Sequence, residues 1–189
     1  MQTVEFDGAP APRVRSTTIL AVRSGGKVAV GGDGQVTLGQ SVLKHGANKI
    51  RVLSKGGVIS GFAGAVADAL TLFERFEGQL EKHPSSLKRA AVELAKEWRT
   101  DKYLRRLEAL LIAATPSELL IISGNGDVIE PDDNIAAVGS GADIARASAK
   151  ALMLAGWTEP RKIVEAALGI AAEICIYTND HITIEEAGG

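Results

Sequence analysis

The sequence predicts an α+β protein arranged as a four-layer α-β-β-α sandwich. Short apolar runs joined by turn signals occur in three groups, and two pairs of amphipathic helical segments separate the groups. Strands joined by hairpin turns form antiparallel sheets, and each helix pair has an apolar face that must be covered. Two sheets packed face to face, with one helix pair outside each, satisfy both requirements.

Two hairpins are expected before the first helix. Ser24-Gly25-Gly26 and Lys55-Gly56-Gly57 are turn signals, and each is flanked by apolar runs rich in β-branched residues. Asp33-Gly34 ends the second run. The four expected strands are residues 19–22, 28–30, 49–53 and 58–63.

Two helices should follow. His83-Pro84 stops the first, because the residue before a proline disfavours the helical conformation. Ser85 is expected to cap the second, since its hydroxyl can accept a hydrogen bond from a free amide in the first turn. The expected inner faces are Val66, Leu70, Phe73 and Leu80 in the first helix and Leu87, Ala91, Leu94 and Trp98 in the second.

The remaining elements repeat this order. The Asn125-Gly126-Asp127 turn indicates a further hairpin, and Gly156 is a typical end for the third helix. The expected strands are residues 110–114, 119–123, 128–129 and 135–138. The expected helices are residues 142–155 and 160–174, and the expected final strand pair is residues 176–177 and 182–184.

Composition narrows the class of protein. The net charge of −2 gives no electrostatic case for a nucleic-acid partner, and no apolar run approaches the roughly 20 residues of a membrane span. The single cysteine, Cys175, cannot form an internal disulfide and fits a reducing compartment, so a cytoplasmic location is expected. Residues 1–16 have no hydrophobic period and predict a leader, followed by one domain over residues 17–189.

Common catalytic patterns are missing from the sequence. His45, His83 and His181 have no spacing that suggests a shared metal or a serine–histidine pair, and no phosphate-loop motif occurs. Residues 135–138 with Gly139-Ser140-Gly141 resemble the opening of a dinucleotide fingerprint, but Ile144 stands where the third glycine belongs. A tight strand-to-helix turn is the better interpretation, and a nucleotide-dependent enzyme remains a distant alternative.

A different nucleophile is available where the leader meets the first strand. If the peptide bond before Thr17 is cut, the freed α-amine can take the proton of the Thr17 hydroxyl, since its pKa is about 7.7–8.0. This would explain a protease without a histidine. Lys49 could lower the pKa of that amine by cationic proximity, and Asp33 could fix the lysine. The alternative to a catalytic role is that Thr17 and Thr18 only help to form the strand.

Eight segments resemble the HslV (ClpQ) family, bacterial peptidases related to proteasome β-subunits. They occur in register over nearly all of residues 17–186, so the resemblance is specific. The segments are TTILAVR from Thr17, GGDGQVTLG from Gly31, KIRVL from Lys49, GFAGAVADALTLFE from Gly61, ELAKEWRTDKYLRRLEALL from Glu93, IISGNGDV from Ile121, AAVGSG from Ala136 and EICIYTND from Glu173.

The resemblance implies an N-terminal nucleophile hydrolase fold and a threonine-type endopeptidase. It implies that Thr17 is the nucleophile, that Lys49 is the essential cation beside it, and that Asp33 is the partner of the lysine. It assigns Ser140 as a supporting hydroxyl near the amine and Gly61 as an oxyanion-hole amide, with Gly64 as a second candidate. It further implies a monovalent cation, sodium or potassium, bound by the backbone carbonyls of Ala172, Cys175 and Thr178, and no organic cofactor.

The resemblance also implies an assembly. Family members form two stacked hexameric rings, and hexamers of an ATPase, HslU (ClpY), deliver unfolded protein substrates to an enclosed chamber. Many members carry only a methionine before the catalytic threonine, whereas sixteen residues precede Thr17 here. We expect these residues to be removed, unless the start site lies downstream. The main alternative is a non-catalytic ring subunit, against which stand Thr17, Asp33 and Lys49.

Overall fold

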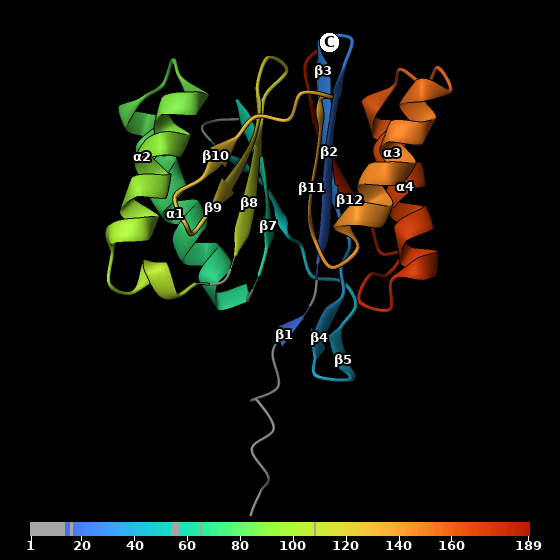
Figure 1. Ribbon diagram of the computed structural model, residues 1–189, viewed down its shortest axis with the longest axis horizontal. Coiled ribbons are helices and arrows are strands. Elements are labelled where there is room, and N and C mark those ends of the chain that lie inside the picture. Colours follow the sequence, from blue (N-terminus) through green and yellow to red (C-terminus); the bar gives the residue numbers. More distant parts are fainter. Residues whose placement is uncertain (1–13, 16, 54–56, 65, 108) are drawn as a thin grey trace, which may run out of the picture.

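The expected four-layer sandwich is present in the computed structural model of the chain. The structure describes residues 14–15, 17–53, 57–64, 66–107 and 109–189. Figure 1 shows the layers side by side: one helix pair, two sheets packed together, and the second helix pair. No helix among these residues is long and apolar enough to cross a membrane.

Antiparallel pairing builds both central sheets. The five-stranded sheet has the order β10-β9-β8-β7-β6, and the four-stranded sheet has the order β11-β2-β3-β12. The strands of the first are β6 (Ile50–Leu53), β7 (Val58–Ala63), β8 (Leu110–Ala114), β9 (Leu119–Ser123) and β10 (Val128–Ile129). The strands of the second are β2 (Thr18–Ser24), β3 (Lys27–Gly32), β11 (Ile135–Gly139) and β12 (Thr183–Ala187).

Each helix pair covers one sheet. The helices are α1 (Val66–Lys82) and α2 (Leu87–Thr100) on the five-stranded sheet, and α3 (Ala142–Leu154) and α4 (Pro160–Ile174) on the four-stranded sheet. A short 3₁₀ helix, η2 (Leu104–Arg106), follows α2. The third apolar layer lies between the sheets, where Ile19 and Val30 of one sheet meet Ile59 and Ile112 of the other.

Two details of the first helix pair differ from the sequence-based expectation. Leu70 is 47% exposed, and the inner face of α1 includes Leu72 and Phe76 instead. The hydroxyl that caps α2 belongs to Ser86, which accepts from the Arg89 amide at 3.2 Å. The helix therefore begins one residue later than predicted. The expected inner face of α2 is fully buried, as predicted.

The strands differ at three places. Residues 176–177 form a turn, so the expected final strand pair is wrong and β12 pairs with β3 instead. Two further strands, β4 (Val36–Leu38) and β5 (Ser41–Lys44), were not predicted: β4 has only three residues, of which Leu38 is exposed, and all four side chains of β5 are exposed. A strand without a buried face shows no alternation of apolar and polar residues, so hydrophobic periodicity cannot predict it.

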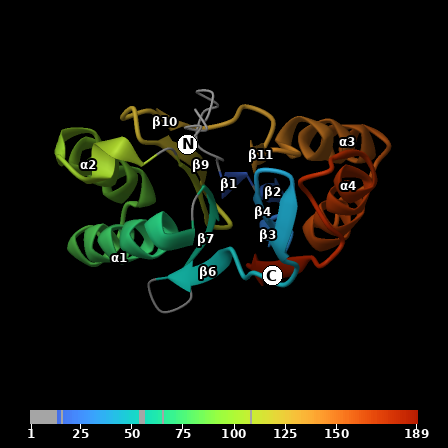
Figure 2. The ribbon, with the colours of Figure 1, turned by 90° about the horizontal axis from the view of Figure 1, so that it is seen from below.

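The described residues of the predicted leader take part in a third, small sheet. Residues 1–13 and 16 of the predicted leader lie outside the described residues, but Val14–Arg15 form β1, which pairs with β4. The sheet has the order β1-β4-β5. Figures 1 and 2 show it at one end of the sandwich, next to the start of β2.

Candidate active site

Thr17 lies at the junction between the leader strand and β2. The residue is 2% exposed, and its carbonyl oxygen accepts a hydrogen bond from the Ser140 amide at 2.9 Å. Its φ of 135° is unusual for a β-branched residue, because the side chain then crowds the backbone. Such strain costs about 1–3 kcal/mol and is concentrated at functional positions.

The carboxylate of Asp33, directly after β3, is buried and accepts four hydrogen bonds. Oδ1 accepts from the Thr18 amide at 2.7 Å and from Lys49 Nζ at 3.0 Å. Oδ2 accepts from the amides of Gln35 at 2.9 Å and Asn179 at 3.4 Å. One carboxylate thus joins the predicted lysine to the residue that follows the predicted nucleophile.

Lys49 immediately precedes β6 and is 7% exposed. Its ammonium group donates to Asp33 and, at 2.6 Å, to the carbonyl oxygen of Gln35. Burial lowers the pKa of Lys49, while the negative charge of Asp33 and the hydrogen bond to it act in the opposite direction. The structure therefore joins Asp33 to Lys49 and, through the Thr18 amide, to the residue that follows Thr17.

The glycine turn between β11 and α3 faces the same junction. A side chain at Gly139, whose φ is 103°, would collide with the Thr17 carbonyl oxygen. The Ser140 amide binds that oxygen, and the Gly141 amide donates to Thr18 Oγ1 at 2.9 Å. Two amides of the turn are thus bonded to the start of β2, which supports a structural turn and leaves the dinucleotide interpretation without support.

The two candidate oxyanion amides point in different directions. Gly61 lies within β7, opposite Ile50 of β6 and Ile112 of β8. The neighbouring Phe62 amide donates to the Lys49 carbonyl oxygen, so by strand alternation the Gly61 amide faces β8, away from the lysine. Gly64 follows the end of β7, and the same alternation directs its amide to the side of Lys49. The geometry therefore favours Gly64.

The three residues predicted to bind a cation lie at the end of α4. Ala172 is in its last turn, Cys175 follows the last helical residue, and the Cys175 carbonyl oxygen accepts from the Thr178 amide at 3.0 Å. Terminal carbonyls of a helix lack intrahelical partners and carry partial negative charge, which suits a hard cation. Within the described residues no cluster of three His, Cys, Asp or Glu side chains could hold a metal. The carbonyl set fits the predicted group.

The sequence did not predict the side-chain contacts of Thr18, Thr178 and Gln35 in the site. Thr18 Oγ1 lies 2.7 Å from Thr178 Oγ1, which links β2 to the segment after α4. Gln35 Nε2 donates to the carbonyl oxygen of Ile176 at 2.9 Å, which ties the Asp33 turn to the same segment. The partners lie 160 and 141 residues apart in sequence, and no local pattern indicates such pairs.

Comparison with known proteins bears on the family, the fold and the enzyme class. The proteasome subunit family matches residues 14–187. A protein of Aquifex aeolicus (strain VF5) named ATP-dependent protease subunit HslV is 62% identical over 173 residues, 92% of this chain and 98% of the relative. A protein of the same name from Sulfurihydrogenibium sp. (strain YO3AOP1) is 59% identical over 174 residues, with the same coverage.

Solved structures have the same fold. The crystal structure of a eukaryotic HslV from Trypanosoma brucei is 46% identical, with a TM-score of 0.87 over 91% of this chain and 99% of that chain. Thiobacillus denitrificans BPH in complex with epoxomicin, at 19% identity and a TM-score of 0.71 over 90% of this chain and 98% of that chain, shares the fold. These matches confirm the predicted fold and enzyme class, the N-terminal nucleophile hydrolase fold and a threonine-type protease. The chain belongs to the proteasome subunit family.

Proposed function

We propose that the chain is the peptidase subunit of an ATP-dependent, self-compartmentalised cytoplasmic protease, and that Thr17 is its nucleophile once residues 1–16 are removed. The observation that carries this proposal is the Asp33 carboxylate, which holds both Lys49 Nζ and the Thr18 amide. A buried lysine is thereby fixed beside the first residues of β2. The two curated relatives are named as subunits of such a protease.

The chemistry follows from the groups at this junction. The Thr17 hydroxyl attacks the scissile carbonyl carbon, and the free α-amine of Thr17 accepts the hydroxyl proton. The amine returns that proton to the departing amine of the substrate, and water then hydrolyses the ester on Thr17. The cationic end of Lys49 favours the unprotonated amine, and the Ser140 hydroxyl supports the amine from the neighbouring turn.

The oxyanion formed in this reaction needs a donor on the lysine side of β7. We assign this role to the Gly64 amide in preference to Gly61, because the Gly61 amide faces β8. A rigid backbone amide can stabilise developing charge without reorganisation, and losing one such donor costs about 10²–10³ in rate.

Removal of the leader is the step that creates the base. While Thr17 is internal its nitrogen is an amide and cannot accept a proton, so an uncut chain is inactive on this mechanism. The φ of 135° at Thr17 strains the backbone beside the bond to be cut. Relief of this strain favours cleavage at residues 16–17.

The proposal includes the assembly that the resemblance implied. Two stacked hexameric rings would enclose the threonines, and HslU hexamers would deliver unfolded protein. Sodium or potassium held by the carbonyls of Ala172, Cys175 and Thr178 would supply positive charge at the end of α4. It would also fix the segment that carries Thr178, whose hydroxyl contacts Thr18.

The nucleophile can be tested with the alanine variants of two adjacent threonines. Thr17→Ala removes the hydroxyl and should abolish hydrolysis of a chromogenic peptide while the oligomer, measured by light scattering, stays intact. Thr17→Ser retains a hydroxyl and should keep part of the activity. General-base assistance is worth about 10²–10⁴-fold, so acetylation of the mature α-amine should silence the enzyme.

Thr18→Ala is the internal control, because Thr18 cannot present a terminal amine after the expected cut. Intact mass of each preparation reports whether the chains begin at Thr17. An active Thr17→Ala together with an inactive Thr18→Ala would move the cleavage point by one residue. Activity in both variants would refute the N-terminal nucleophile mechanism, whereas a correctly processed wild type without any peptidase activity would favour the alternative of a non-catalytic ring subunit.

A further inference from the structure

We propose that the Asn179 side chain is a positioning residue of the active site, which fixes the turn carrying Asp33 to the loops on either side of it. The inference rests on the proposed function, since it assigns Asn179 through its effect on Asp33 and Lys49. Asn179 lies in the loop between α4 and β12, beyond the residues that the sequence singled out for catalysis or cation binding.

The carboxamide of Asn179 connects three segments. Its Oδ1 accepts from the Gly34 amide at 3.1 Å and from the His181 amide at 3.3 Å. Its Nδ2 donates to the His45 carbonyl oxygen at 2.9 Å. Only a carboxamide offers an acceptor and a donor in this planar arrangement, because a carboxylate accepts at both oxygens and a hydroxyl is too short to span both groups.

The residue is also bonded directly to the catalytic carboxylate. Its backbone amide donates to Asp33 Oδ2 at 3.4 Å, while its side chain holds Gly34, the next residue of the turn. Gly34 is itself closely packed: an added Cβ there would meet the backbone of Gly46 at 3.0 Å. The Asp33 turn is therefore fixed both at its carboxylate and at the following backbone amide.

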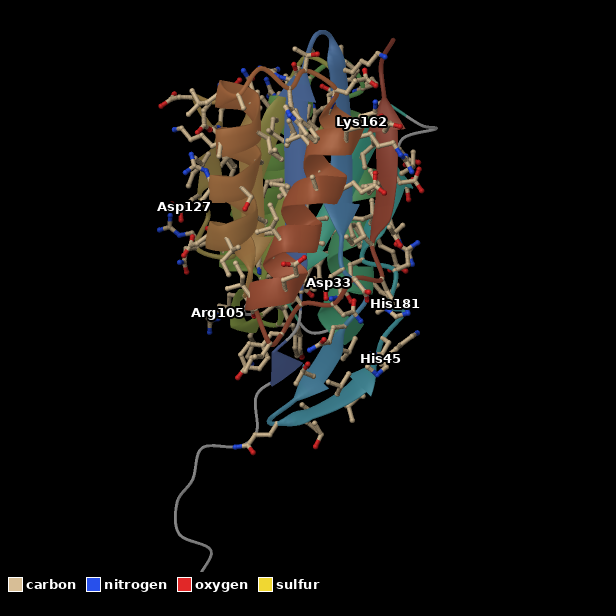
Figure 3. All side chains as sticks on the ribbon, turned by 90° about the vertical axis from the view of Figure 1, so that its right-hand side faces the viewer. Asp33, His45, Arg105, Asp127, Lys162 and His181 are labelled. Carbon is tan, nitrogen blue, oxygen red and sulfur yellow. The ribbon has the colours of Figure 1, made fainter. Side chains whose placement is uncertain are left out.

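Charged and titratable groups among the described residues adjoin this clamp at one end of the sandwich. Asp33 and Lys49 are on its inner side, and His45, His181 and Asp180 are on its outer side. The rings of His45 and His181 lie 6.2 Å apart. Figure 3 shows Asp33, His45 and His181 at the same end of the molecule, close to the three-stranded sheet.

Position matters here because Asp33 Oδ1 orients both Lys49 and the Thr18 amide. Small displacements of catalytic groups reduce turnover strongly, up to about 10²-fold for a shift near 1 Å. Loss of the carboxamide should therefore lower kcat and leave substrate binding nearly unchanged. A residue that only stabilised the fold would not separate these two quantities.

Two substitutions distinguish positioning from charge. Asn179→Ala removes both hydrogen-bonding groups and adds no charge. Asn179→Asp keeps the shape and the Oδ1 acceptor, but it places an oxygen against the His45 carbonyl and a negative charge beside Asp33. In chains whose intact mass shows that they begin at Thr17, both should lower kcat about 10–100-fold with little change in KM.

The pH profile separates the two variants further. Added negative charge near the site stabilises the protonated α-amine of Thr17, so the acidic limb of the kcat profile should move to higher pH in Asn179→Asp. In Asn179→Ala the limb should stay at its wild-type position. A carboxamide that acted only on folding would move this limb in neither variant.

Asn134→Asp is the matched control. Asn134 also joins two segments through its carboxamide, with Oδ1 accepting from Arg23 Nε at 3.0 Å, and it lies at the other end of β2. Replacing the amide nitrogen by an oxygen at position 134 should leave kcat and its pH profile at the wild-type values. All variants are assayed at a temperature at which circular dichroism shows folded protein.

Wild-type kcat in both Asn179 variants would overturn the inference, and so would failure of both variants to fold. Lys49→Ala is measured in parallel to separate this result from the proposed function. If the Asn179 variants are fully active while Lys49→Ala is inactive, only the positioning role fails. If Lys49→Ala retains wild-type activity, the proposed chemistry fails regardless of Asn179.

Discussion

The two halves of the sandwich are packed with residues of different size. The helix pair α1–α2 covers its sheet with large side chains, among them Phe73, Phe76 and Trp98. The described residues of α3 and α4 include no aromatic side chain, and the pair buries Ala145 and Ala167 beside aliphatic residues such as Ile163 and Leu168. Small residues allow a close approach of helix and sheet, because less volume separates the backbones.

The close approach in the second half is visible at Gly31 of β3. A Cβ at this position would lie 2.5 Å from a methyl group of Val164 in α4, so only glycine fits. The segment after α4 accordingly reaches the end of β3, where Asn179 and Thr178 meet Asp33 and Thr18. Small residues in one helix layer thus help to position the active site.

The active site itself is divided between the halves. Thr17, Asp33 and Ser140 come from the four-stranded sheet and its connections, whereas Lys49 and Gly64 come from the strands of the other sheet. The catalytic arrangement therefore depends on the apolar layer between the sheets. We therefore expect substitutions in one half of the sandwich and substitutions in the layer between the sheets to differ in their effects on turnover.

The largest effect is expected from the lysine that the first half contributes. Lys49→Ala should reduce peptide hydrolysis by about 10²-fold or more, because the α-amine loses its neighbouring cation and Asp33 loses one partner. The fold should survive, since three backbone amides still donate to Asp33. Steady-state kinetics and light scattering test both statements.

Lys88 provides a control on the same half of the molecule. It is exposed and pairs with Glu130 at 3.3 Å on the surface of α2. Lys88→Ala should leave activity unchanged, because exposed ion pairs contribute little. A Lys49→Ala enzyme that kept most of its activity would show that the lysine is structural.

A smaller effect is expected from a change in the layer between the sheets. Gly61→Ala would place a Cβ 2.5 Å from Ile19 Cγ2 and 3.1 Å from Ile50 Cδ1. Overpacking of this kind lowers the free energy of unfolding by about 1–3 kcal/mol. Because Ile19 and Ile50 adjoin Thr18 and Lys49, kcat should fall as well. Urea unfolding and kinetics at a folded temperature measure the two effects separately.

Gly78→Ala in α1 is the opposite case. An added Cβ at Gly78 meets no atom within 4 Å, so the substitution only removes the backbone freedom of glycine in a helix. It should raise the free energy of unfolding by about 0.5–1 kcal/mol and leave activity unchanged. Equal losses of activity in the two variants would contradict a special role for the layer between the sheets.

The smallest effect is a pH dependence of stability that arises from Lys49. Burial lowers the pKa of Lys49 in the folded state below 10.5, so between the two values the unfolded chain binds more protons. The free energy of unfolding therefore increases as the pH rises through this interval. The increase is about 1.4 kcal/mol for each unit by which the pKa of Lys49 differs between the unfolded and the folded chain.

Lys49→Met lacks this contribution. The stability of the wild type relative to this variant should increase when urea unfolding is repeated at about pH 9.5 instead of about pH 7. Taking the difference between the two proteins removes the titration of other lysines and tyrosines, which both share. A difference that falls with pH would show that Asp33 outweighs burial and raises the pKa of the lysine.

Most elements with one buried face could be predicted from the sequence. The inner face of α2 and the strand β8 were placed correctly, because apolar spacing records which side is buried. Strands β4 and β5 were missed, since β4 has only three residues and all the side chains of β5 are exposed. The turn at residues 176–177 was mistaken for a strand because an apolar pair in a loop resembles a short strand.

The candidate site, too, has features that the sequence predicted and features that it did not. Thr17, Asp33 and Lys49 were identified through segments of the sequence, and the structure pairs Asp33 with Lys49 and with the amide of Thr18, the residue after Thr17. The direction of the Gly61 and Gly64 amides could not be foreseen, because it depends on which neighbour each strand position faces. The contacts that Thr178 and Asn179 make with Thr18, Asp33, Gly34 and His45 join residues between 134 and 160 positions apart.

The sequence by itself therefore determined most of the order of the elements, most of the faces they bury and the candidates for the reactive side chains. These properties depend on residues that are close together in the sequence, through the spacing of apolar residues and through short motifs. Only the tertiary structure decided how Asp33 joins Lys49 to Thr18, and how Asn179 fixes the Asp33 turn. These contacts arise when two sheets and the end of α4 meet, and the packing that brings them together is a property of the whole chain.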